Sequence, residues 1–221
     1  MLMAKKNIVK SGLVLWLEGK DFTNTPQTTS WRDRSGLDNN GTPINMAYTT
    51  ASGSDGSGGV AFDGVNDYVS LQDPLTIFDS SFSFECWLFF DDNSRAVILG
   101  DFGLSGSVNI NIERNTSNVL RLYWGGIPDI VTGVNVLTTN IWQHIAIVRD
   151  KSASKVYFYV NSVLVYTYFG TISDKTATIP HRFGRDSRSG TTAFDGSMVD
   201  VRIYNRALTD SEIRQNYNVS R

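Results

Sequence analysis

The amino-acid sequence predicts a single all-β domain, a sandwich of two antiparallel sheets. Apolar and polar residues alternate with a period of two along most of the chain, and the alternating segments are rich in β-branched and aromatic residues. Turn-forming residues separate these segments about every 8–12 positions, which is typical of antiparallel sandwiches. The length of 221 residues lies within the range of one such domain, and the 41% of hydrophobic residues suffices for one buried core.

The predicted strands are the alternating segments that lie between turn-forming residues. The strands expected from this pattern, in chain order, are 13–18, 60–63, 68–71, 82–90, 96–101, 108–113, 119–124, 142–149, 155–160, 163–168, 182–184 and 198–204. In the segment 82–90, Phe82, Phe84, Cys86, Leu88 and Phe90 share one face, because successive side chains of a strand point to opposite sides. We expect that face to lie in the core, with the lone cysteine buried and inert.

Three local patterns complete the expected fold. Asn161 and Ser162 separate two alternating runs and predict a β-hairpin, because asparagine tolerates the left-handed conformation of a two-residue turn. Thr209 and Glu212 form a capping box that predicts one short C-terminal helix. The run 49–59 is rich in glycine and serine and predicts a flexible loop.

Charge, hydropathy and cysteine content argue against several classes of protein. The net charge is −2, so we expect no nucleic-acid partner, and no membrane insertion because the apolar run after residue 12 stops at Glu18. The same run is too short for a signal-peptide core, so we expect synthesis in the cytoplasm. A single cysteine cannot form an intrachain disulfide.

Five stretches in order along the chain carry a family resemblance. They are Gly12–Leu17 with Trp31–Gly36 and Asn39–Thr42, then Val60–Val69, Phe82–Leu88, Trp142–Arg149 with the hairpin that follows, and Phe194–Ile213. Together they resemble the laminin G-like group of the concanavalin A-like lectin and glucanase superfamily. The opening is also similar to domains of structural proteins of tailed bacteriophages, and bacterial cell-surface proteins carry similar domains.

The resemblance implies a jelly roll with adjacent termini and a face that relatives often use for glycans. It places the domain at residues 12–221, after an N-terminal arm at residues 1–11. It implies location in a virion or on an extracellular surface. The same sandwich hosts lectins, glycosidases and structural domains, so the fold alone does not fix the function.

Catalytic patterns are missing from the sequence. Glucanases of this superfamily carry Glu-x-Asp-x-x-Glu on one strand, and retaining glycosidases need two carboxylates about 5–5.5 Å apart. The nearest stretch here has Asn109 and Asn111 in place of the first two acids and retains only Glu113. His144 and His181 lack a neighbouring nucleophile motif and are interpreted as structural. We therefore expect no enzymatic activity.

One structural Ca²⁺ is implied by the resemblance, because related sandwiches hold one between their first and last strands. Asp200 matches an acidic position of that last strand, and Glu18 or Asp21 could lie beside it. The alternative is that Asp200 pairs with an arginine such as Arg202 or accepts backbone N–H bonds.

Aromatic residues near loops or strand ends are the candidates for glycan contact, because sugar rings stack on aromatic faces while polar side chains fix the hydroxyls. The candidate ligand-binding residues are Trp31, Tyr123, Trp124, Tyr168, Arg185 and Asp186. Trp16, Trp87 and Trp142 lie within apolar strands and are interpreted as core or sheet-face residues.

These patterns favour a non-catalytic binding module for carbohydrate in a virion or cell-surface assembly. The alternative is a capsid or tail decoration protein that binds other virion subunits without a glycan. Expected partners are therefore a glycan or other virion or surface proteins, and a homo-oligomer would present several weak sites together. A glycan binder should have an open polar and aromatic groove, whereas a decoration protein should have a large apolar patch.

Overall fold

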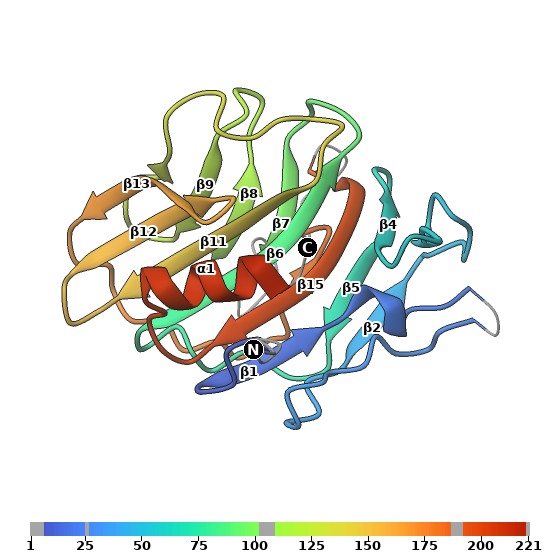
Figure 1. Ribbon diagram of the computed structural model, residues 1–221, viewed down its shortest axis with the longest axis horizontal. Coiled ribbons are helices and arrows are strands. Elements are labelled where there is room, and N and C mark those ends of the chain that lie inside the picture. The colour runs from blue at the N-terminus through green and yellow to red at the C-terminus, as the bar shows by residue number, and fades with distance from the viewer. Residues whose placement is uncertain (1–6, 25–26, 102–108, 187–191, 220–221) are drawn as a thin grey trace, which may run out of the picture.

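The computed structural model describes residues 7–24, 27–101, 109–186 and 192–219. Two antiparallel sheets face each other across one core, and one helix lies on the outer side (Figure 1). The predicted fold class is confirmed.

The eight-stranded sheet has the order β13-β12-β11-β6-β15-β4-β3, and β1 pairs with β15. Its strands are β1 (Leu13–Leu17), β3 (Gly53–Ser54), β4 (Val60–Asp63), β6 (Phe82–Phe90), β11 (Gln143–Asp150), β12 (Lys155–Val160), β13 (Val163–Phe169) and β15 (Asp195–Tyr204).

The seven-stranded sheet has the order β10-β9-β8-β7-β14-β5-β2. Its strands are β2 (Gly41–Ile44), β5 (Tyr68–Leu71), β7 (Ala96–Gly100), β8 (Ile110–Arg114), β9 (Leu120–Trp124), β10 (Ile130–Val131) and β14 (Arg182–Phe183). Outside the sheets lie the 3₁₀ turn η1 (Gly19–Asp21) and helix α1 (Asp210–Val219).

The core lies between the sheets. All five apolar residues of the predicted inner face of β6 are buried there, Cys86 among them. Burial of each such large side chain contributes about 1.5–3 kcal/mol relative to exposure. Burial also raises the pKa of the Cys86 thiol well above its usual value, which keeps it unreactive at neutral pH.

Helix α1 forms as its capping box predicts. The backbone N–H of Glu212 donates to Oγ1 of Thr209 at 3.3 Å, and the N–H of Thr209 donates to Oε2 of Glu212 at 2.9 Å. Figure 1 shows α1 lying across the face of the sheet that contains β11, β6 and β15. Its Ile213 packs with Ala146 and Val148 in a second apolar cluster, so the helix covers one part of that sheet's outer face. With ten residues, it is too short to cross a membrane, and no other described helix is long and apolar enough.

The ends of the described chain meet, as the resemblance implies. Nε2 of Gln215 donates to the carbonyl of Asn7 at 2.7 Å. Within the predicted arm, Val9 is buried and its N–H donates to Oδ1 of Asn216 at 2.8 Å. Residues 1–6 of the arm lie outside the described residues, and the boundary at residue 12 stays a prediction.

The hairpin turn is confirmed, since Asn161 and Ser162 both have positive φ, 51° and 64°. The expectation of a flexible loop throughout 49–59 is wrong, because Gly53–Ser54 forms β3 and pairs with β4. The side chain of Asn24 holds this short strand by bonding both the N–H and the carbonyl of Ser54. Strands β2 and β10 were not expected from the sequence, and Val108 of the expected strand 108–113 lies outside the described residues.

Candidate functional site

The outer face of the eight-stranded sheet is uncovered beyond the end of α1. Strand register aligns two rows of side chains there. Ser197 of β15 lies between Ala61 of β4 and Phe89 of β6, and Val199 lies beside Trp87. Their sequence neighbours, such as Phe62, Leu88 and Met198, point into the core, so alternation places these rows on the outside.

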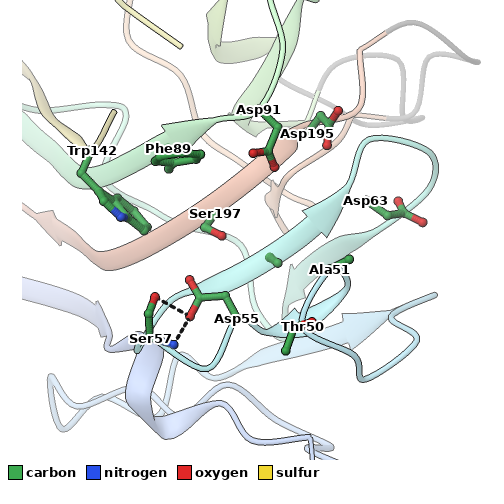
Figure 2. A pocket seen from close by; sticks show the side chains of 11 residues that line it. Thr50, Ala51, Asp55, Ser57, Asp63, Phe89, Asp91, Trp142, Asp195 and Ser197 are labelled. Atoms are coloured by element: carbon green, nitrogen blue, oxygen red, sulfur yellow. Dashed lines mark hydrogen bonds between the residues drawn. The ribbon is translucent and has the colours of Figure 1, made fainter. Parts of the chain in front are cut away.

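Two adjoining hollows occupy this uncovered area. The acidic basin has a volume of about 420 Å³ and is lined by Thr50, Ala51, Asp55, Ser57, Ala61, Asp63, Phe89, Asp91, Trp142, Asp195 and Ser197 (Figure 2). The aromatic basin has a volume of about 640 Å³ and is lined by Ser57, Gly58, Trp87, Trp142, Asn161, Val199 and Tyr217. Because Ser57 and Trp142 line both, the two basins form one groove.

Trp142 stands where the basins meet. It precedes β11 and is 37% exposed, a large value for a tryptophan. Its ring packs on that of Phe89, with 5.6 Å between centroids, and Figure 2 shows the two side by side. The groove therefore has an apolar platform open to solvent at its centre.

The aromatic basin ends at helix α1. The ring of Tyr217 stacks on that of Trp87, and the buried ring of His144 lies 5.5 Å from that of Trp87 between centroids. Trp87 itself is only 9% exposed, and its Nε1 has no hydrogen-bond acceptor among the described residues. The Nε1 atom is itself buried, so this indole N–H is an unsatisfied buried donor and not one open to solvent.

Carboxylates surround the other end of the groove. Asp55 and Asp63 are used within their own turns, where each accepts backbone N–H bonds. Asp91 and Asp195 lie together at the ends of β6 and β15 (Figure 2). Burial and the neighbouring charges of Asp92, Asp91 and Asp63 raise the pKa of Asp195. This end of the groove thus has a negative potential.

Burial contradicts the expected exposure of two ligand candidates. Trp31 and Trp124 are fully buried in the core, where their Nε1 atoms donate to the carbonyls of Glu18 and Ser173. Neither ring has a face open to solvent, since Trp31 packs edge-to-face with Phe22 and Trp124 stacks on Phe82. Neither can serve as a sugar platform.

The other candidates do not gather at the groove. Asp186 is buried and accepts from Nδ2 of Asn111 at 2.9 Å, which makes it part of the seven-stranded sheet's own packing. Tyr123, Tyr168 and Arg185 are partly exposed, and none of them lines either basin. Ligand contact by these three stays a prediction, and residues 187–190 of the loop that follows Asp186 lie outside the described residues.

The three predicted metal ligands are engaged with cations instead. Asp200 lies 3.1 Å from the guanidinium of Arg202, which is the pairing that the sequence analysis gave as the alternative to a metal. Glu18 and Asp21 both form ion pairs with Arg34. Ca²⁺ takes six to eight oxygen ligands, and these positive neighbours repel it. Among the described residues there is also no group of three or more acidic, histidine or cysteine side chains suited to a metal. Paired in this way, the three side chains do not fit calcium.

Glu113, the one acid retained from the glucanase pattern, is also neutralised. It is fully buried and forms ion pairs with Arg95, at 2.8 Å, and with Arg121. A carboxylate held by two guanidinium groups in this way is a poor nucleophile.

The amino-acid sequence contains only a weak indication that Trp142, Trp87 and Phe89 line a groove. Trp142 comes two residues after the polar run Thr138–Asn140 and directly before β11, where a side chain is more easily exposed than at the centre of a strand. Trp87 and Phe89 occupy the second face of segment 82–90, which the alternation left unassigned. The part of that face that stays exposed depends on where helix α1 ends on the sheet. This is a matter of tertiary packing, which local sequence patterns do not predict.

Known proteins support the architecture. The model of the Laminin_G_3 family, described as concanavalin A-like lectin/glucanases superfamily, matches residues 63–214. No curated protein matches the sequence.

Several solved structures share the fold at low sequence identity. A Trypanosoma rangeli sialidase in complex with sialic acid is 17% identical with a TM-score of 0.68, over 93% of this chain and 32% of that one. A botulinum neurotoxin serotype D binding domain is 13% identical with a TM-score of 0.69, over 95% and 52%. A Bacteroides ovatus protein proposed to bind carbohydrate is 23% identical with a TM-score of 0.55, over 67% and 44%. The chain thus spans about a third of the sialidase's length, and the similarity establishes the fold.

Proposed function

The chain belongs to the concanavalin A-like lectin/glucanases superfamily, and from this membership we propose that it is a non-catalytic carbohydrate-binding module that uses the groove. The observation that carries the proposal is Trp142, an exposed indole where an aromatic and an acidic basin meet. The similarity to a protein proposed to bind carbohydrate adds support for this class of ligand.

The groove has the two kinds of contact that a sugar needs. The faces of Trp142 and Phe89 offer an apolar surface for the C–H groups of a sugar ring. The carboxylates of Asp91 and Asp195 and the hydroxyl of Ser197 can accept hydrogen bonds from sugar hydroxyl groups. The combination favours a polar ligand with apolar faces.

The absence of catalysis is part of the proposal. The Glu-x-Asp-x-x-Glu pattern is missing, and the remaining Glu113 is held by two arginines. Because one of the similar structures is a sialidase, the hydrolysis assay must also test whether an acidic residue of the groove is catalytic. Asp195, whose pKa is raised, is the residue there that could donate a proton as a general acid.

We further propose a virion or cell-surface setting, on the basis of the sequence resemblance. Many copies on one particle would turn weak single sites into useful avidity. The alternative, a decoration protein without a glycan, is favoured by the edge strand β13, where Val163, Leu164 and Phe169 are 63%, 44% and 73% exposed. Such an apolar edge could dock on other subunits.

A glycan array tests the proposal, followed by a hydrolysis assay on every glycan that binds. We expect glycan binding that is at least tenfold weaker in Trp142→Ala and unchanged in Phe169→Ala, which removes an exposed aromatic outside the groove. We expect no hydrolysis. Turnover that disappears in Asp195→Asn would contradict the non-catalytic assignment, and binding to virion proteins without any glycan would favour the decoration alternative.

A further inference from the structure

We propose that the groove selects glycans that carry protonated amino groups and rejects anionic glycans. This inference rests on the proposed function and concerns the ligand class of the same site. It follows from the charge of the groove lining and from two carboxylates and one indole N–H that have no partner among the described residues.

Among the described residues, every charged side chain that lines the groove is acidic. Asp55, Asp63, Asp91 and Asp195 line the acidic basin, and among the described lining residues of both basins there is no lysine, arginine or histidine. An anionic sugar needs a cationic partner to offset the loss of its hydration when it enters a groove. Here it would instead meet like charge, which is destabilising.

Asp91 and Asp195 differ from the other two acids because no described turn or strand uses their carboxylates. Asp55 accepts N–H bonds from Ser57 and Gly59, and Asp63 accepts one from Val65. For the carboxylates of Asp91 and Asp195, no hydrogen bond or ion pair is present within the described part of the chain. The two carboxylates lie next to each other in Figure 2.

This pair of carboxylates is suited to a shared cation. Burial raises the pKa of Asp195, and the charges of Asp92, Asp91 and Asp63 raise it further. A protonated amine placed between Asp91 and Asp195 would relieve that repulsion and donate up to three hydrogen bonds. A neutral sugar could donate hydroxyl groups to the same oxygens but would leave the charges uncompensated.

The aromatic basin provides an independent indication of a ligand. Trp87 is more than nine-tenths buried and lines this basin, and its Nε1 is without an acceptor among the described residues. A buried donor left unsatisfied costs about 1–3 kcal/mol. The Nε1 atom has almost no accessible surface, so a ligand oxygen gains this bond only if the neighbouring rings move aside. Because Trp142 joins the basins, an oligosaccharide stacked on it can reach both Trp87 and the carboxylates.

The test compares three oligosaccharides of equal length by isothermal titration calorimetry on the whole protein. They are a glucosamine oligomer, its N-acetylated counterpart and a galacturonate oligomer, at a pH where the amines are protonated. We expect the glucosamine oligomer to bind about tenfold more tightly than the N-acetylated one, and the galacturonate oligomer not to bind. Because a charge interaction is screened by salt, raising ionic strength should weaken only the glucosamine complex.

Substitution locates the effect. Asp91→Asn and Asp195→Asn should each remove most of the tenfold preference and leave the affinity for the N-acetylated oligomer within about twofold. Asp73→Asn, which removes one exposed carboxylate outside the groove, should leave the preference unchanged. Melting temperatures of all three variants verify that they are folded.

The two proposals fail in different ways. Galacturonate binding equal to or tighter than glucosamine binding would overturn the charge selection and leave the carbohydrate-binding proposal in place. A preference that survives in both Asp91→Asn and Asp195→Asn would also overturn it. If none of the three oligomers binds and the glycan array is empty as well, the proposed function itself fails.

Discussion

The indole of Trp87 stacks on the phenol ring of Tyr217, with 5.3 Å between the ring centroids and 17° between the ring planes. Trp87 belongs to β6 and Tyr217 to the last turns of α1, so the helix supplies one wall of the aromatic basin. The C-terminal helix therefore both covers part of the sheet and delimits the groove.

Tyr217→Ala should weaken glycan binding about tenfold, because an aromatic pair contributes about 0.5–1.5 kcal/mol beyond its burial and the variant removes both the wall and the support of Trp87. Tyr217→Phe keeps the ring and should retain binding within about twofold. Calorimetric titration measures both. Equal affinities of Tyr217→Ala and the wild type would show that the helix is not part of the site.

A buried ion pair anchors the same helix. Nη1 of Arg202 lies 2.8 Å from Oε1 of Glu85, both side chains are fully buried, and Nδ2 of Asn216 on α1 donates to the same carboxylate oxygen. Arg202→Met should lower the free energy of unfolding by about 3–5 kcal/mol, because it leaves a buried carboxylate without its counter-charge.

The matched control for Arg202→Met is the double variant Glu85→Gln, Arg202→Met. Since both charges are then gone, it should recover part of the lost stability in urea denaturation. A double variant less stable than Arg202→Met would contradict a role for charge compensation and point to packing alone.

Stability should fall as the solution is acidified. Burial, and then the charge of Arg202, lowers the pKa of His144 to about 3, and burial lowers that of His181 to about 4 despite Asp101. Oε2 of Glu85 lies 3.6 Å from Nε2 of His144, but with so low a pKa the ring is neutral at pH 7 and this contact is not an ion pair. Both rings thus stay neutral in the folded state over a range in which the unfolded chain protonates.

The unfolded chain takes up these protons below a pH of about 6.5, whereas the folded protein does not until about 4 or lower. Each histidine therefore costs about 1.4 kcal/mol of stability per pH unit as the pH falls through this window. Urea denaturation between pH 7 and 5 measures the slope, and His144→Gln should reduce it by one histidine's share. An unchanged slope in that variant would mean that His144 is protonated in the folded state.

Calcium is tested by melting the protein in chelator and in millimolar CaCl₂. With Asp200, Glu18 and Asp21 paired to Arg202 and Arg34, we expect the same melting temperature in both. A ligand at a hundred times its Kd would add about 2.7 kcal/mol. A clear upward shift with calcium, lost in Asp200→Asn, would instead support the calcium site that the family resemblance implies.

Most strands were predictable because their signal is local. The segment 82–90 and the hairpin at Asn161 alternate over many residues, and the structure places them as expected. Strands β2, β3 and β10 have two to four residues and include Gly41, Pro43 and Gly53, so alternation could not indicate them. Their pairing comes from neighbouring strands and not from their own composition.

The site was less predictable than the fold because exposure is a tertiary property. Trp31 follows a polar loop but is drawn into the core by its bridge to Gly41. Trp142 lies in an apolar context and yet is exposed, because α1 ends before it covers that part of the sheet. Asp200 has a positive φ of 52° and lies at a β-bulge, where the register of β15 shifts between Val199 and Arg202. The bulge leaves Val199 and Arg202 on the same face of the sheet. Simple alternation of apolar and polar residues cannot reveal such a bulge.

The most direct test of the groove is the affinity of one array-identified glycan for three proteins, measured by calorimetric titration: the wild type, Trp142→Ala and the control Phe169→Ala. Trp142 and Phe169 are both exposed aromatics, at 37% and 73%, but only Trp142 lines the groove. Loss of a stacking platform should cost about 1.4 kcal/mol or more, a weakening of at least tenfold, in Trp142→Ala alone. Equal affinities of Trp142→Ala and the wild type, or loss of binding only in Phe169→Ala, would contradict the claim that this groove binds carbohydrate.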